Sequence, residues 1–214
     1  MTRSPILLLL PLSLGVAAFV TDWTPVKMAV PLSVAAIALL SGEVRRLSWR
    51  GRRGWRVWLV VAMLLSTAGD WYLSNSRRVP SFFAVGMGFY AAAMGAYLAL
   101  ELCRGGVSRR VSGLTILVFV SYVVVLLVPA ADSPTMRWLL VVYGVLASLI
   151  FGGAWGVQDD QRWAMVTAVS LILLSDFLIS QAVFLGNDNW DVLILPTYYA
   201  AHVLLARQAQ RLPF

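Results

Sequence analysis

The sequence predicts an all-α fold, a polytopic membrane bundle of about eight transmembrane helices, from three observations. The chain of 214 residues is 60% hydrophobic and only 13% charged, and its mean hydropathy of +0.79 is far above that of a soluble domain. Its apolar stretches approach the ~20 residues that a membrane-spanning helix needs. Its basic residues concentrate at alternate ends of these stretches. We therefore expect a single transmembrane helical domain over residues 1–214.

The expected helices are separated by short loops. They lie near residues 5–20, 27–41, 57–74, 80–101, 110–130, 136–156, 162–184 and 191–207. The opening segment has the charge and apolar core of a signal peptide, but no convincing small-x-small cleavage site follows, so it is interpreted as the first helix. No loop exceeds about 15 residues, which leaves no room for a domain outside the membrane. The functional site is therefore expected between the helices.

The distribution of Lys and Arg predicts the topology. If both termini are cytoplasmic, 13 of the 17 basic residues lie on the inner side, including Arg3 and a cluster at residues 45–56, and 4 lie outside. The outer residues are Lys27, Arg77, Arg78 and Arg137. This positive-inside pattern accounts for the net charge of +7 without a nucleic-acid partner. We expect an integral protein of a bacterial-type inner or plasma membrane. Its expected partners are the bilayer and a lipid or isoprenoid substrate, and the sequence does not predict an oligomeric state.

Two acidic residues lie inside apolar stretches. Of the ten Asp and Glu residues, eight fall in loops or at helix ends, which leaves Asp70 and Asp176 within helices. Each is about 14 residues, or ~20 Å, from the cytoplasmic end of its helix, so the two share a depth at which no Lys or Arg is expected. A charged side chain at mid-bilayer costs at least ~2.5–3.5 kcal/mol, so such residues usually have a function. Desolvation favours the protonated form, and if the two acids meet, one can hold the proton that the other lacks.

The surroundings of the two acids are alike. GDWYLS (69–74) and SDFLIS (175–180) share, in the same order, a small residue, Asp, an aromatic residue, an aliphatic residue and Ser. The two motifs lie four helices apart and therefore have the same expected orientation. This spacing suggests two parallel four-helix repeats. The alternative is a chance similarity in a chain that is rich in Leu and Ser.

Aromatic residues and one histidine are expected near the acids. The last helix runs opposite to the Asp helices and brings its polar aromatic residues to a similar level. The candidate substrate-binding residues are Trp71, Tyr72, Phe89, Tyr90, Phe177, Tyr198, Tyr199 and His202. The sequence has no HExxH-like or Cys-rich spacing, so no metal is expected, and no other cofactor is expected either. It also has no GxSxG motif, so a serine nucleophile is not expected. Packing through hydrogen bonds across helices stays open as an alternative role of the two acids.

Four segments carry a resemblance to a known family. LLSTAGDWYLS (64–74), VGMGFYAAAMGAYLAL (85–100), LLSDFLISQAVF (173–184) and PTYYAAHVLLA (196–206) are similar to segments of the YhhN-type lysoplasmalogenases, eight-span membrane proteins that hydrolyse the vinyl-ether bond of lysoplasmalogens. The resemblance covers most of the chain and implies that Asp70 and Asp176 are the catalytic acids, with Tyr198 or Tyr199 as companions.

One position departs from the family's pattern. The family usually places a His about four residues after the aromatic residue of its fourth helix, where this chain has Ala93 or Met94. This weakens the hydrolytic assignment, because that His would help to position water. His202 replaces it only if the fourth and eighth helices approach one another.

Three functions are compatible with these features. Vinyl-ether hydrolysis begins when an acid protonates a carbon of the C=C bond, and water then captures the oxocarbenium ion, so a neutral buried Asp suits the general acid. The same first step starts the cyclisation of prenyl chains by membrane terpene cyclases, which exclude water and stabilise carbocations with aromatic faces. A non-enzymatic lipid transporter or proton-coupled transporter also uses buried carboxylates and repeats. The resemblance favours the hydrolase.

Overall fold

The computed structural model describes residues 5–21, 23–40 and 54–211, which excludes Arg3 and the basic residues at 45–53. Within the described ranges the regular structure is helical throughout, without a strand, as the predicted all-α fold requires. The helices are η1 (Pro5–Leu8), α1 (Leu9–Thr21), α2 (Thr24–Leu40), α3 (Trp55–Asn75), α4 (Ser81–Arg104), α5 (Arg109–Tyr122), η4 (Val123–Leu127), α6 (Val128–Ala130), α7 (Pro134–Gly156), α8 (Arg162–Leu185) and α9 (Asp191–Arg211).

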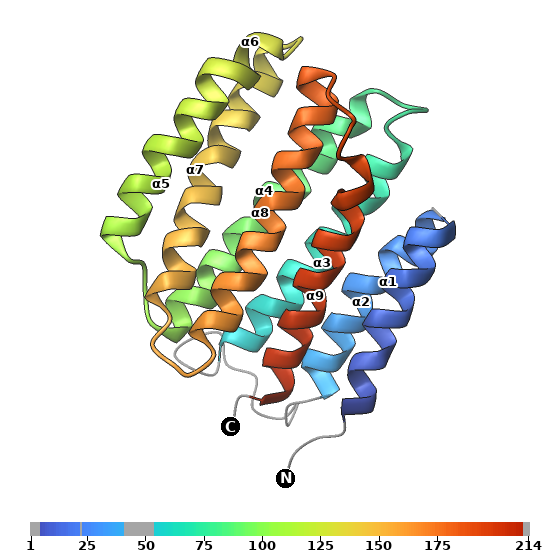
Figure 1. Ribbon diagram of the computed structural model, residues 1–214, viewed down its shortest axis with the longest axis vertical. Coiled ribbons are helices and arrows are strands. Elements are labelled where there is room, and N and C mark those ends of the chain that lie inside the picture. Colours follow the sequence, from blue (N-terminus) through green and yellow to red (C-terminus); the bar gives the residue numbers. More distant parts are fainter. Residues whose placement is uncertain (1–4, 22, 41–53, 212–214) are drawn as a thin grey trace.

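The described helices form a bundle of rods that run up and down (Figure 1). One rod covers residues 109–130, because α5, the π-helical turn η4 and α6 follow one another without a break. The start of α1 and the end of α9 lie at the same end of the bundle, called the inner end below (Figure 1). The side of the membrane that the inner end faces stays a prediction.

Not all of the expected membrane spans are equally long and apolar. Among the described helices, five are long and apolar enough to cross a membrane: Trp55–Asn75, Ser81–Arg104, Arg109–Ala130, Pro134–Gly156 and Arg162–Leu185. Helices α1 and α2 are shorter, with 13 and 17 residues, and α9 is not among the five. The structure therefore supports a membrane bundle, and the count of eight spans is not confirmed.

Packing between helices follows a pattern that two parallel repeats predict. The helix of the first Asp motif, α3, packs chiefly against the next rod, α4, and the helix of the second motif, α8, packs chiefly against α9. Between the halves, α4 packs against α7 and α9 packs against α2. The first half consists of α1 to α4, and the second half consists of the rod at 109–130 followed by α7, α8 and α9. In each case the fourth rod of one half contacts the second rod of the other half. The two Asp helices therefore have matching places in the bundle.

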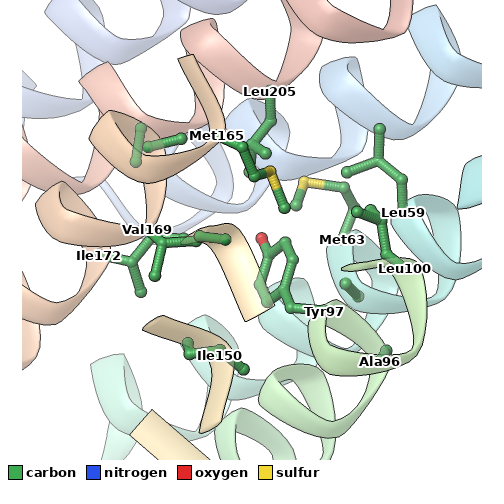
Figure 2. Packing of buried hydrophobic residues seen from close by; sticks show 14 of the residues in the cluster. Leu59, Met63, Ala96, Tyr97, Leu100, Ile150, Met165, Val169, Ile172 and Leu205 are labelled. Carbon is green, nitrogen blue, oxygen red and sulfur yellow. The ribbon is translucent and has the colours of Figure 1, made fainter. Parts of the chain in front are cut away.

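An apolar cluster fills the bundle between the acids and the inner end. This inner apolar cluster comprises Leu59, Met63, Tyr97, Leu100, Ile150, Met165, Val169, Ile172 and Leu205. Figure 2 shows the Tyr97 ring packed beside Met63 and Met165. Both Met residues precede the Asp of their own helix, by 7 residues in α3 and 11 in α8. Close-packed side chains without polar partners exclude water, so this cluster separates the acids from the inner end.

Charged residues tie the helices together below this cluster. The Arg104 guanidinium, at the end of α4, donates two hydrogen bonds to Asp159, over 3.0 and 2.8 Å, and a third to Gln208 of α9, over 2.6 Å. Arg104 also lies over the Trp55 ring of α3, 5.7 Å from its centroid. A guanidinium with carboxylate and amide acceptors is well satisfied although buried. This network fixes the inner ends of α3, α4, α8 and α9 relative to one another.

Candidate active site

Asp70 accepts hydrogen bonds from two tyrosines on different helices. The Tyr90 hydroxyl of α4 donates to its Oδ1, and the Tyr198 hydroxyl of α9 donates to its Oδ2 over 3.4 Å. The two hydroxyl oxygens are also 3.4 Å apart. Both donors stabilise the carboxylate form of Asp70.

Gly69 makes room for the Tyr90 ring. A Cβ atom at position 69 would lie 2.7 Å from Cδ2 and from Cε2 of Tyr90, closer than atoms can approach. The small residue before Asp70 therefore lets the Tyr90 ring approach α3 closely, and the hydroxyl group of this ring reaches the carboxylate. This contact explains the Gly-Asp pair of the first motif.

Asp176 has a different set of partners. The Tyr143 hydroxyl of α7 donates to its Oδ2 over 2.8 Å. The preceding residue, Ser175, donates from its hydroxyl to the Ile194 carbonyl of α9 over 3.1 Å. The small residue of the second motif thus binds α8 to α9, whereas that of the first motif accommodates a ring.

Asp176 lines a cavity in the outer half of the bundle. The cavity has a volume of about 80 Å³, below the roughly 300–1,000 Å³ that is typical of small-molecule sites, and it opens to the surroundings of the bundle. Its polar lining residues are Tyr90, Tyr122, Tyr143, Asp176 and Ser180, and its other lining residues are Leu73, Phe83, Met87, Phe119, Val123, Leu127, Leu140, Gly144, Ala147, Leu173, Phe177, Ile179 and Phe184. Asp70 is not among the described residues that line it; Tyr90 stands between this carboxyl group and the cavity.

The predicted aromatic residues divide between the cavity and other surroundings. Tyr90 and Phe177 line the cavity. Tyr72 and Phe89 stack on each other, with ring centroids 5.3 Å apart, and do not belong to the lining. Trp71 is 46% exposed on the outside of the bundle. Of the predicted substrate-binding residues on α3 and α4, the structure therefore brings only Tyr90 to this cavity.

The predicted residues of α9 pack beside the Asp70 site. Tyr198 donates to Asp70, as described above, and Tyr199 packs toward Gly15 of α1, where a Cβ would lie 3.2 Å from the Tyr199 Cβ. His202 is fully buried, and its ring lies 4.2 Å from that of Tyr198. These three residues do not line the described cavity.

His202 does not take the place of the missing His of the fourth helix in the cavity. Side chains of α4 and α9 do meet, at Tyr90 and Tyr198, so the helices approach as this replacement requires. However, the His202 Nδ1 lies 2.8 Å from the Tyr198 carbonyl, to which it donates, so the ring is committed to its own helix. Ala93 and Met94 are buried in the core.

Sequence reasoning missed two parts of the site. The first is Tyr143, the partner of Asp176, whose surroundings VVYGVL contain no motif. The second is a polar group beside the cavity, in which the Tyr122 hydroxyl lies 2.7 Å from the Ser180 hydroxyl and accepts from Gln181 over 2.9 Å. The signal that could have identified these residues is a polar side chain inside an apolar stretch, either a Tyr or the final Ser of the repeated motif.

Outside the site, the structure shows an unexpected environment for Glu101, which the sequence placed at a helix end. It does lie in the last turn of α4, but it is fully buried, and neither carboxyl oxygen has a hydrogen-bond partner within the described residues. Gly153 of α7 makes room for it, because a Cβ there would lie 2.0 Å from the Glu101 Oε2. Glu101 lies near the inner end, away from the cavity.

The arrangement combines a carboxyl group with an apolar cavity. A protonated Asp176 can donate its proton to a substrate atom in the cavity, while Tyr143 orients it and the aromatic walls hold an apolar chain. A model of the YhhN family matches residues 23–209, which is most of the chain. No curated protein and no solved structure matches the chain. The match over so much of its length shows that the chain belongs to the YhhN family, the lysoplasmalogenase-like family that its sequence resembles.

Proposed function

We propose that this protein is a membrane-embedded hydrolase that cleaves the vinyl-ether bond of a lysoplasmalogen, with Asp176 as the general acid. The observation that carries the proposal is the position of the Asp176 carboxyl group on the wall of an otherwise largely apolar cavity. Membership of the YhhN family supports the same reaction.

The walls of the cavity suit part of one lipid chain. Its Leu, Val, Met and Phe residues match an alkenyl chain, of which the volume of about 80 Å³ holds a short stretch, with the rest of the chain at the open side. No Lys or Arg belongs to the described lining, so a phosphate head group would stay at the mouth. The C=C bond would then lie beside Asp176, below the outer end of the cavity.

The inner apolar cluster supports an enzyme over a transporter. A transporter needs access to its site from both sides in turn. Here close-packed residues such as Met63 and Met165 precede the acids on the side of the inner end; Figure 2 shows their packing. Among the described residues, this cluster contains no charged group that would carry a proton across it.

A second candidate function is the proton-initiated cyclisation of a prenyl chain. The observation that favours it is the number of aromatic rings in the cavity, including Phe119, Tyr122 and Phe177, whose faces stabilise carbocations. The hydrolase and the cyclase share the first proton transfer and differ in whether water is admitted.

The test is product analysis with the purified protein in liposomes. A lysoplasmalogen should release a fatty aldehyde, which in D₂O, after trapping by reduction, carries one deuterium on the carbon next to the former carbonyl. The matched control is the lysolipid with a saturated ether in place of the vinyl ether, which should stay intact. A farnesylated or polyprenyl substrate converted to a cyclic isomer of equal mass would establish the cyclase, and failure of the lysoplasmalogen to react would overturn the hydrolase.

A further inference from the structure

We propose that the hydroxyl group of Tyr90, with the Asp70 carboxylate behind it, is the base that activates the attacking water, so that Asp70 acts on the substrate only through Tyr90. The inference rests on the proposed hydrolysis and assigns the two acids different roles. It starts from the finding that the cavity is lined by Asp176 and Tyr90 but not by Asp70.

The hydrogen bonds distinguish the two acids. Each tyrosine hydroxyl has one proton, and both Tyr90 and Tyr198 direct theirs to Asp70. Asp176 accepts from Tyr143 alone among the described hydroxyl donors. Two hydrogen bonds from hydroxyl groups stabilise a carboxylate better than one does. The negative charge is therefore assigned to Asp70 and the proton to Asp176 at the start of the reaction.

The position of Tyr90 suits a relay. Its ring is held against α3 by Gly69, and its hydroxyl is bonded to the Asp70 Oδ1. Its side chain also forms part of the cavity wall that includes Asp176 and Tyr143. A water molecule between the substrate and this wall meets Tyr90 before it can meet Asp70.

The proton balance of the reaction closes with these groups. Asp176 donates its proton to the outer vinylic carbon, a C–H bond forms, and the carbon bonded to oxygen becomes an oxocarbenium ion. Water adds to that carbon and gives one proton to the Tyr90 oxygen, while the Tyr90 proton moves to Asp70. The hemiacetal then collapses: its hydroxyl proton passes to the glycerol oxygen, the C–O bond breaks, and the aldehyde leaves. A proton returns from Asp70 through Tyr90 and the next water to Asp176.

Deuterium incorporation into unreacted substrate tests the inference. In the wild-type protein, water captures the cation faster than the cation returns its proton, so substrate recovered from D₂O carries no deuterium. In Tyr90→Phe the capture should slow, and the cation should revert, leaving deuterium on the vinylic carbon of recovered substrate. Turnover should fall about 100-fold, at the lower end of the range for general acid–base catalysis. Asp70→Asn should show the same incorporation.

The matched control is Tyr97→Phe. Tyr97 lies on the same helix as Tyr90 but belongs to the inner apolar cluster and does not line the cavity, so removal of its hydroxyl group should cause no incorporation and less than about a threefold loss of turnover. A slower Tyr90→Phe without incorporation would show a structural role only and would overturn the inference. If Tyr90→Phe does not fold, 3-fluorotyrosine at position 90 keeps the ring and the hydroxyl but lowers its basicity. The 3-fluorotyrosine variant should then show partial deuterium incorporation into recovered substrate. If no deuterium is incorporated, the inference is also overturned.

These outcomes separate the inference from the function on which it rests. If the wild-type protein releases aldehyde and the Tyr90→Phe variant is equally active, only the assignment of the base is overturned. Wild-type protein that releases no aldehyde overturns the hydrolase and the assignment together.

Discussion

The regions around Asp70 and Asp176 share a sequence motif and a depth but have different partners. The helix bounds place Asp70 15 residues after the start of α3 and Asp176 14 residues after the start of α8, or about 22 and 21 Å along the helix. Asp70 accepts from tyrosines of α4 and α9, and Asp176 accepts from a tyrosine of α7 and faces the cavity. A repeated motif can thus place two like groups in matching positions, and their neighbours then give them different chemistry.

The tyrosines show where the resemblance between the halves ends. Tyr90 follows Asp70 by 20 residues, and Tyr198 follows Asp176 by 22, each on the next rod. Both hydroxyl groups nevertheless bind Asp70. Because the first half contributes no counterpart of Tyr143 to Asp70 within the described residues, the two acids are unequal.

The largest predicted effect separates the acids directly. Asp176→Asn removes the proton donor and should lower aldehyde release by about 10³–10⁴-fold, whereas Asp70→Asn should lower it by about 100-fold. Turnover of each purified variant in liposomes measures this difference. The control is the same type of substitution at an exposed position: Asp160→Asn, in the turn between α7 and α8, should be fully active. Equal losses in the two variants would show that the acids are equivalent.

A smaller effect is expected from the tyrosine that orients Asp176. Tyr143→Phe removes its hydrogen bond and should lower turnover by about 10–100-fold, the equivalent of the ~1.5–3 kcal/mol of a hydrogen bond to a charged or ionisable group. The substrate KM should change little, because the ring still fills the wall. If Tyr143→Phe behaves like the control Tyr97→Phe, with a loss of less than about threefold, Asp176 does not depend on its partner.

Hydropathy and helical spacing were sufficient to predict most of the fold. The expected helix at 110–130 corresponds to the rod at 109–130, and the expected helix at 57–74 to α3. The length and apolar character of a span are local properties that a single sequence records. The two acids were identifiable for the same reason, because a charge in an apolar stretch is conspicuous.

The partners of the acids could not be predicted in the same way. Tyr143 lies 33 residues from Asp176, and only the packing of α7 against α8 brings the two together. Trp71 was expected beside Asp70 because it is adjacent in sequence. Consecutive residues of an α-helix point about 100° apart, so when Asp70 points into the bundle Trp71 points outward. The role of Gly69 likewise depends on a ring from another helix.

The residues before the two acids offer a matched pair of substitutions. Gly69→Ala should displace the Tyr90 ring, cost ~1–3 kcal/mol of stability as overpacked sites do, and lower turnover about tenfold. Ser175→Ala removes one hydrogen bond to the Ile194 carbonyl and should cost ~1 kcal/mol or less. Thermal unfolding in detergent and turnover measure the two effects. Equal turnover of Gly69→Ala and wild type would mean that the Tyr90 position is not critical.

The smallest predicted effects concern two aromatic residues that follow the acids directly. Phe177 is 41% exposed and Trp71 46% exposed, yet only Phe177 lines the cavity. Phe177→Ala should raise the KM for the lipid about fivefold, because part of an apolar contact with the chain is lost, and should leave kcat nearly unchanged. Trp71→Ala should change both constants by less than about twofold, since surface positions contribute little. A larger effect of Trp71→Ala would place a second substrate contact on the outer face of α3, and with it a direct approach of the lipid to the Asp70 side. The two acids would then differ less in function than their hydrogen bonds indicate.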